Sequence, residues 1–219
     1  MSLKQMLSLF APSLALVLAL GPSDAPGAAA DRKSKVILFL GDSLTAGYGV
    51  SLDQAFPSLI QQRIDAKGWN FKVVNAGQSG DTTAGGLGRI DWLLRQPIDI
   101  LVLELGANDG LRGLPVEAAK NNLQAIIDKA RKRYPSVKVV LMGMRLPPNL
   151  GKDYAAAFNS IFPELASKKK TVLVPFLLEG IGGVPRLNLP DGIHPTAEGH
   201  RMIAANVWRV LEPVLRSML

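Results

Sequence analysis

Short apolar runs alternate along the chain with longer segments in which apolar residues recur at helical spacing. The runs are rich in Val, Ile and Leu and almost continuously hydrophobic, as expected of strands covered on both faces. They occupy residues 36–40, 71–75, 98–106, 137–143 and 171–176. The other segments predict helices near 53–67, 83–95, 115–134, 152–169 and 195–217. Pro115 and Pro195 suit first-turn positions, where a missing N–H has no helical partner.

This alternation predicts the fold class. Strand followed by helix, repeated five times, is typical of an α/β protein whose parallel sheet lies between two layers of helices. No internal repeat or low-complexity linker follows residue 31, so we expect residues 31–219 to form a single domain. In open sheets of this kind, ligands bind at the carboxyl ends of the strands. Chemically useful residues should therefore come directly after the predicted strands.

Residues that could take part in catalysis do follow four of the five predicted strands. Ser43 follows the first strand, and Gly80 lies in "NAGQSGDTT" after the second. Asn108 lies in "GANDG" after the third. The stretch "LPDGIHPTAEGH", after the fifth, holds Asp191 and His194. We expect these four stretches to converge on one edge of the sheet.

The residue types indicate acyl transfer by a serine nucleophile. A serine hydroxyl is a poor nucleophile near neutral pH and needs a base within hydrogen-bond reach. The chain has two histidines, His194 and His200. His194 lies in a turn three residues beyond Asp191, whereas His200 falls within the last predicted helix, where we expect a half-exposed position. Ser43, His194 and Asp191 are therefore the candidate triad. A structural histidine and a plain turn aspartate are the alternatives.

Acyl transfer also needs hydrogen-bond donors aimed at the oxygen on which negative charge develops. The backbone N–H of Ser43 is available if a helix begins there, because first-turn amides lack intrahelical partners. The N–H of Gly80 is approachable, since glycine has no side chain, and the side-chain amide of Asn108 is a neutral donor. A turn that requires positive φ is the alternative role of Gly80. Local backbone capping is the alternative role of Asn108.

Four sequence blocks carry a resemblance to a known family. In their order and spacing, "GDSLTAGYG", "SGDTTAG", "LGANDGLRGLP" and "DGIHP" resemble the blocks of the SGNH, or GDSL-type, hydrolases. The segment from about 35 to 215 is most similar to their bacterial thioesterase I/protease I/lysophospholipase L1 and arylesterase group. The resemblance implies a three-layer flavodoxin-like fold with strand order 2-1-3-4-5. It also implies Ser43 as nucleophile, Gly80 and Asn108 as oxyanion donors, and Asp191 with His194 as the rest of the triad.

Several other chemistries are disfavoured. The chain lacks cysteine and has two histidines, which argues against a catalytic zinc cluster, and we expect no metal and no cofactor. It contains no G-x-S-x-G elbow and no phosphate-binding P-loop motif. No basic run is interleaved with aromatic residues, so a nucleic-acid partner is not expected. We expect Asp42 to bond neighbouring loops and Asp109 to cap backbone amides.

The sequence predicts the reaction but leaves several substrate classes open. "LRGLP" and "RLPPNLG" follow the third and fourth strands, and we expect Leu111, Leu146 and Pro147 to contact an acyl chain, with ordinary loop packing as the alternative. Lysophospholipids, aryl esters and acyl thioesters all suit the predicted chemistry. A carbohydrate O-deacetylase and a non-catalytic envelope-binding module are the competing interpretations. The sequence does not indicate an oligomeric state.

The N-terminus and the net charge bear on location. Lys4, an apolar stretch at residues 6–20 and small residues at 28–30 predict a cleaved signal peptide over residues 1–30, with an uncleaved anchor as the alternative. A signal peptide implies that the protein is exported to the periplasm or secreted. The formal charge of +7 favours loose contact with anionic membrane surfaces. "RKR" at 131–133 and "KKK" at 168–170 lie where helices should end, and we expect them to be solvated.

Overall fold

A computed structural model describes residues 34–219, so the predicted signal peptide lies outside the described residues. Five parallel strands form one sheet in the order β2-β1-β3-β4-β5. This confirms both the parallel α/β class and the strand order. The strands are β1 (Lys35–Gly41), β2 (Phe71–Gly77), β3 (Ile100–Glu104), β4 (Lys138–Met142) and β5 (Val172–Val174).

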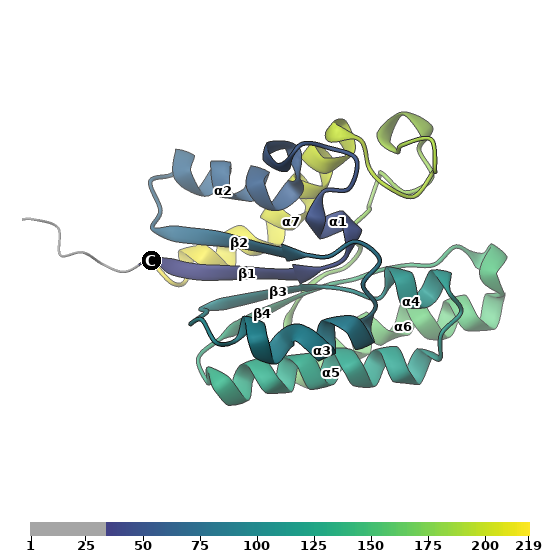
Figure 1. Cartoon of the computed structure of the whole chain (residues 1–219), viewed down its shortest axis with the longest axis horizontal. Coiled ribbons are helices and arrows are strands. Elements are labelled where there is room, and N and C mark those ends of the chain that lie inside the picture. The colour runs from purple at the N-terminus through teal and green to yellow at the C-terminus, as the bar shows by residue number, and fades with distance from the viewer. Residues whose placement is uncertain (1–33) are drawn as a thin grey trace, which may run out of the picture. The chain divides into compact units, whose positions relative to one another are not determined.

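Helices cover both faces of this sheet (Figure 1). On one face α2 (Phe56–Ala66) packs against α7 (Ala197–Arg216). On the other face α5 (Val116–Arg133) contacts both α3 (Thr83–Leu93) and α6 (Lys152–Lys169). None of the helices in the described part of the chain is long and apolar enough to cross a bilayer.

The core explains why the central strands β1 and β3 are so uniformly apolar. Ile37–Leu40 of β1 are almost fully buried, and all five residues of the central strand β3 are buried. The predicted third strand ran on to residue 106, but pairing stops at Glu104. Gly106 adopts φ +121° and caps the next helix, which ends the extended conformation. A conformation of that kind favours glycine.

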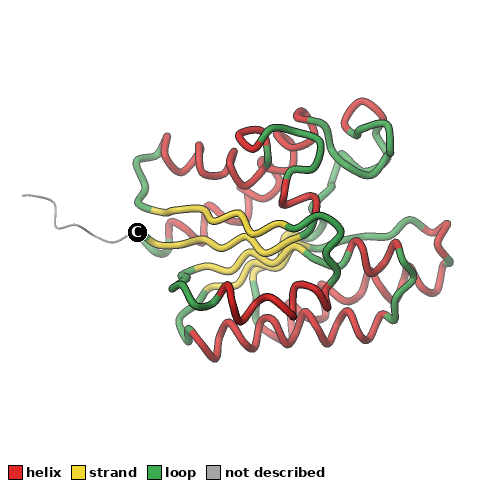
Figure 2. Tube along the Cα trace, in the orientation of Figure 1, coloured by secondary structure: helices red, strands yellow, loops and turns green. Residues whose placement is uncertain are grey.

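The carboxyl ends of the strands lead into short elements that the apolar pattern does not specify. Figure 2 shows the strands running into loops and short helices at this end. Here α1 (Ser43–Ala46) follows β1, and α4 (Ala107–Leu111) follows β3. Three short 3₁₀ turns cover Leu52–Gln54, Pro148–Leu150 and Pro185–Leu187.

The two prolines expected in first turns lie slightly outside their helices. Pro115 is the N-cap of α5. Pro195 precedes Thr196, whose side chain caps α7 by accepting a hydrogen bond from the N–H of Gly199. Proline just before a helix costs no helical hydrogen bond, because the first N–H groups have no partner. The predicted helix bounds differ from the observed ones by at most two residues, except that α2 begins three residues later than predicted.

Candidate active site

Ser43 is presented by a tight junction between β1 and α1. Asp42 caps α1, and its Oδ1 accepts a hydrogen bond of 2.9 Å from the N–H of Leu44. A Cβ on Gly41 would lie within 2.5 Å of both Thr45 Oγ1 and Glu104 Oε2, so only glycine fits there. The strand therefore delivers Ser43 to the first position of a helix, where its backbone N–H lacks an intrahelical acceptor.

The two other candidate triad residues occupy one turn before α7. Asp191 Oδ1 accepts hydrogen bonds from the N–H groups of Ile193 (2.8 Å) and His194 (2.9 Å). Asp191 Oδ2 lies 2.7 Å from His194 Nδ1, and His194 Nε2 lies 3.0 Å from Ser43 Oγ. The structure thus brings together three side chains from distant parts of the sequence in one hydrogen-bonded row.

The surroundings of His194 hold the imidazole in position and keep its partner Asp191 ionised. Hydrogen bonds from the backbone and the side chain of His194, and from the N–H of Ile193, lower the pKa of Asp191 to about 2. That carboxylate stays ionised at any working pH. The ring of Tyr48 lies against the imidazole, with centroids 4.3 Å apart. Asp191 and Tyr48 therefore hold the imidazole from two directions.

Of the other two predicted oxyanion donors, Asn108 lines the same cavity as Ser43, and Gly80 adjoins Asp81, whose carbonyl accepts from Asn108. Asn108 is in the first turn of α4, and its Nδ2 donates to Asp81 O (2.9 Å) and to Asp42 Oδ2 (3.2 Å). Gly80 adopts φ +81°, which glycine tolerates, and its N–H has no acceptor among the described residues. Arg112 Nη2 donates to the carbonyl of Gly80 at 3.0 Å.

Beneath Ser43 lies a buried pair of acids, Asp42 and Glu104, of which sequence reasoning missed Glu104. Glu104 Oε2 accepts from the N–H of Asp42 (3.1 Å) and from Thr45 Oγ1 (2.7 Å). Its Oε1 is buried with no hydrogen-bond partner among the described residues. Burial, reinforced by the nearby Asp42 charge, raises the pKa of Glu104 well above its usual range. Burial also raises the pKa of Asp42 to about 6.

An arginine bridge was also missed by the sequence reasoning. Arg89 on α3 donates to Asp81 Oδ2 (2.7 Å), to Ala76 O (2.7 Å) and to Gly41 O (2.9 Å). It ties the loop that carries Gly80 to the end of β1. In the sequence the available signal was an arginine eight residues after Asp81, on the helix that this aspartate precedes.

Asp109 and Asp42 behave as expected from the sequence. Asp109 accepts hydrogen bonds from the N–H (2.8 Å) and the hydroxyl (2.6 Å) of Thr83 at the start of α3. Asp42 bonds α1 and α4 through Leu44 and Asn108. Both side chains are buried and connect the loops at the carboxyl end of the sheet.

The prediction for His200 was wrong. We expected a half-exposed surface position, but the side chain is fully buried, and its Nδ1 accepts a hydrogen bond of 3.2 Å from the N–H of Phe56. It packs parallel to the Phe56 ring. The α7 face that carries it closes onto the start of α2, so this histidine is structural and lies apart from the row formed by Ser43, His194 and Asp191.

A cavity of about 630 Å³ opens from Ser43 and His194. Leu111, Leu146 and Pro147 line it, where the sequence placed them. Leu146 is nearly buried and packs close to Gly110, whereas Leu111 is 46% exposed. Sequence reasoning missed further lining residues, which are mostly apolar: Met144, Arg145, Phe176, Leu178 and Ile193.

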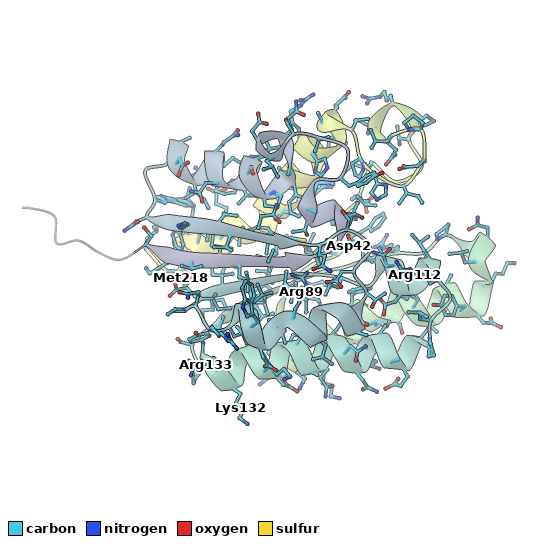
Figure 3. All side chains as sticks on the ribbon, in the orientation of Figure 1. Asp42, Arg89, Arg112, Lys132, Arg133 and Met218 are labelled. Carbon is cyan, nitrogen blue, oxygen red and sulfur yellow. The ribbon has the colours of Figure 1, made fainter. Side chains whose placement is uncertain are left out.

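The site lies at the carboxyl end of the sheet. In Figure 3, Asp42 and Arg112 mark this end, beside α1 and α4. The described residues contain no cluster of His, Asp or Glu that could hold a metal ion.

The fold is flavodoxin-like α/β, and the site places a serine, a histidine and an aspartate in hydrogen-bonded order at the carboxyl end of the sheet. The chain belongs to the GDSL-like lipase/acylhydrolase family, which matches residues 39–202. It is therefore a carboxylic ester hydrolase.

Known proteins resemble it over most of its length. Esterase TesA of Pseudomonas aeruginosa is 43% identical over 83% of this chain and 90% of its own. The thioesterase 1/protease 1/lysophospholipase L1 of Escherichia coli is 39% identical over 82% of this chain and 84% of its own. A crystal structure of TesA covers 82% of this chain and 99% of its own, with 42% identity and a TM-score of 0.78.

Proposed function

We propose that the protein is a serine esterase whose nucleophile is Ser43, with His194 as general base and Asp191 as the group that orients it. The observation that carries this proposal is the row Asp191–His194–Ser43, with contacts of 2.7 and 3.0 Å, at the mouth of an apolar cavity. With Nδ1–H donated to Asp191, the free Nε2 accepts the Ser43 proton as Oγ attacks the acyl carbonyl.

The second half of the cycle uses the same groups in reverse. Protonated His194 donates to the leaving alcohol or thiol, and an acyl ester of Ser43 remains. Water, activated by the neutral imidazole, then attacks this ester and releases the acid. Asp191 stays ionised throughout and stabilises the imidazolium. The cycle needs no metal or cofactor.

The oxyanion is received by the N–H groups of Ser43 and Gly80 and by the amide of Asn108. In the free protein both N–H bonds of Asn108 are engaged, the longer contact being that to Asp42 Oδ2 at 3.2 Å. We infer that the substrate oxyanion replaces Asp42 as acceptor while the bond to Asp81 O keeps the amide in place. Removal of such a donor typically costs about 10²–10³ in kcat.

The cavity supports esters with an apolar acyl chain. Its walls are aliphatic and aromatic, with Leu111, Leu146, Met144 and Phe176 among them. Such walls suit lysophospholipids, aryl esters and acyl thioesters better than the polar sugar esters of an O-deacetylase. The names of the relatives, an esterase and a thioesterase/lysophospholipase, lie in the same substrate range.

We further propose that residues 1–30 are a signal peptide and that residues 31–219 act as one exported hydrolase domain, periplasmic or secreted. The sequence supports this through Lys4, the apolar stretch at 6–20 and the small residues at 28–30. Export separates the enzyme from cytosolic acyl-CoA, which favours lipid and aryl esters. Loose contact with anionic membranes follows from the net charge.

Steady-state hydrolysis of p-nitrophenyl esters tests the nucleophile. We expect Ser43→Ala to lower kcat by roughly 10⁴–10⁶-fold while the far-ultraviolet circular dichroism and the melting temperature stay close to wild type. Ser160→Ala, on the outer side of α6, is the matched control and should keep full activity. Retention of most of the wild-type rate by Ser43→Ala would refute the assignment.

A further inference from the structure

A second surface lies at the end of the sheet opposite the candidate active site. Helices α3 and α5 both end there, because their carboxyl ends meet the amino ends of the parallel strands. Figure 3 places Lys132 and Arg133 at this end, away from Asp42 and Arg112. The surface combines a basic hollow with an apolar one, and we refer to the two together as the basic end surface.

The basic hollow has a volume of about 550 Å³ and four cations around it: Arg95, Lys129, Lys132 and Arg133. Its carboxylate, Asp91, pairs with Lys129 at 2.5 Å. Arg95 and Lys132 form no ion pair with any residue that the structure describes. Arg133 lies 5.6 Å from the ring centroid of Tyr134, a contact that leaves its charge in place. The hollow is therefore positively charged.

The apolar hollow adjoins it and has a volume of about 410 Å³. Arg95 lines both hollows, so they are contiguous. Trp92 is 65% exposed at its edge, and Val74 of the edge strand β2 is also exposed. The other two tryptophans, Trp69 and Trp208, stack on each other instead. An exposed tryptophan beside an apolar hollow is typical of an interaction site.

We propose that the basic end surface docks on an anionic phospholipid bilayer. Lysine and arginine near a bilayer are attracted by anionic headgroups, and tryptophan prefers the depth of the headgroups. A second copy fits poorly, because a two-fold symmetric contact would oppose the same cations to one another. A nucleic acid would use the cations and leave most of the apolar hollow unused. The lipid surface accounts for both parts.

The start of the first strand lies at the end of the sheet that we propose docks on the bilayer. β1 begins at Lys35 at the same end of the sheet, so the polypeptide enters the sheet beside the basic end surface. Docking at this end turns the cavity beside Ser43 away from the bilayer, toward substrates that arrive through water. The inference makes the proposed membrane contact specific to one surface, and it does not depend on the catalytic assignments.

Co-sedimentation of the mature chain, residues 31–219, with vesicles tests the surface, because the apolar stretch at 6–20 would itself bind a bilayer. One set of vesicles is phosphatidylcholine alone, and the other contains about one third phosphatidylglycerol. The test variants are Arg95→Glu/Lys132→Glu and Trp92→Ala. The matched control is Arg201→Glu/Arg209→Glu, which changes the net charge equally on exposed residues of α7, on the other face of the sheet.

We expect binding to the anionic vesicles only, and weaker binding as salt is raised. The Arg95/Lys132 reversal should lower the partition coefficient by at least about tenfold, and the α7 control by less than about threefold. Trp92→Ala should weaken binding and abolish a blue shift of the tryptophan emission on vesicles. Hydrolysis of p-nitrophenyl acetate should be unchanged in all variants, which separates this test from that of the nucleophile.

Three results would overturn the proposal. Equal loss in the α7 control would show that net charge, and no particular surface, drives the binding. Equal binding to phosphatidylcholine alone would remove the role of the cations. Tighter retention by a single-stranded RNA probe than by anionic vesicles at the same salt would assign the surface to a different partner.

Discussion

At the residue scale, two acids buried beneath the serine set the properties of the site. Glu104 receives hydrogen bonds from the N–H of Asp42 and the hydroxyl of Thr45, so it fixes the turn that presents Ser43. Two ionised carboxylates at this depth would repel each other, and burial already disfavours each charge. Burial and the Asp42 charge therefore favour the neutral form of Glu104, and its Oε2 acts as a hydrogen-bond acceptor.

The raised pKa of Glu104 has a defined consequence for stability. Above pH 4.5 the glutamate ionises readily in the unfolded chain but not in the folded protein. Ionisation therefore stabilises the unfolded chain, and the free energy of unfolding falls as pH rises. Glu104→Gln keeps an acceptor and removes the titration. We expect the melting temperature of wild type to fall relative to Glu104→Gln as pH rises from about 5 to about 9. Parallel melting curves across that range would contradict this account.

His200 acts on stability in the opposite direction. Burial, and secondarily the charge of His194, lowers its pKa from 6.5 to about 4. Because the unfolded chain binds the proton first, stability is lost as pH falls from about 6.5 to about 4. That shift corresponds to about 3 kcal/mol.

Urea denaturation checks this prediction at pH 7 and pH 4. His200→Asn keeps an acceptor for the N–H of Phe56 but does not titrate. Wild type should lose about 3 kcal/mol more than the variant between the two values. An equal loss in both proteins would mean that the protonation of His200 is not linked to folding.

At the element scale, the short helix α4 and the loop after β4 form the walls of the cavity. Leu111 ends α4 and is half exposed, so its contact with a long acyl chain would bury surface that a short chain leaves in water. The wall should therefore matter only for long-chain esters.

Leu111→Ala tests this wall. We expect kcat/KM for p-nitrophenyl decanoate to fall by about five- to tenfold, with little change for the acetate. Leu150→Ala, at an exposed leucine outside the cavity lining, is the control. An unchanged dependence on acyl length in Leu111→Ala would show that this leucine serves loop packing alone.

The same elements show how far the sequence could predict the site. Strands covered on both faces are recognisable from continuous apolar runs, and the carboxyl-end rule then collects Ser43, Asn108 and His194 at one edge. Glu104 was missed because a single polar residue inside an apolar run does not indicate a role in the site. His200 was misplaced because helical periodicity does not reveal that the N–H of Phe56 needs an acceptor on that face.

At the scale of the whole molecule, the parallel sheet separates two surfaces. Its carboxyl end carries Ser43, His194 and the cavity, and its amino end carries the basic end surface. The alternation of strands and helices predicted a parallel sheet, but the order β2-β1-β3-β4-β5 came from the family resemblance. Periodicity reports which segments are strands, whereas their neighbours depend on contacts between distant segments.

The most direct measurement is the site of covalent modification. A fluorophosphonate reacts with a serine only where a base activates it, and the mass of the intact protein and of its peptides locates the adduct. We expect one adduct, on the peptide that contains Ser43, with labelling abolished in Ser43→Ala and strongly slowed in His194→Ala. An adduct on another serine, or an active esterase that remains unlabelled at Ser43, would contradict the account.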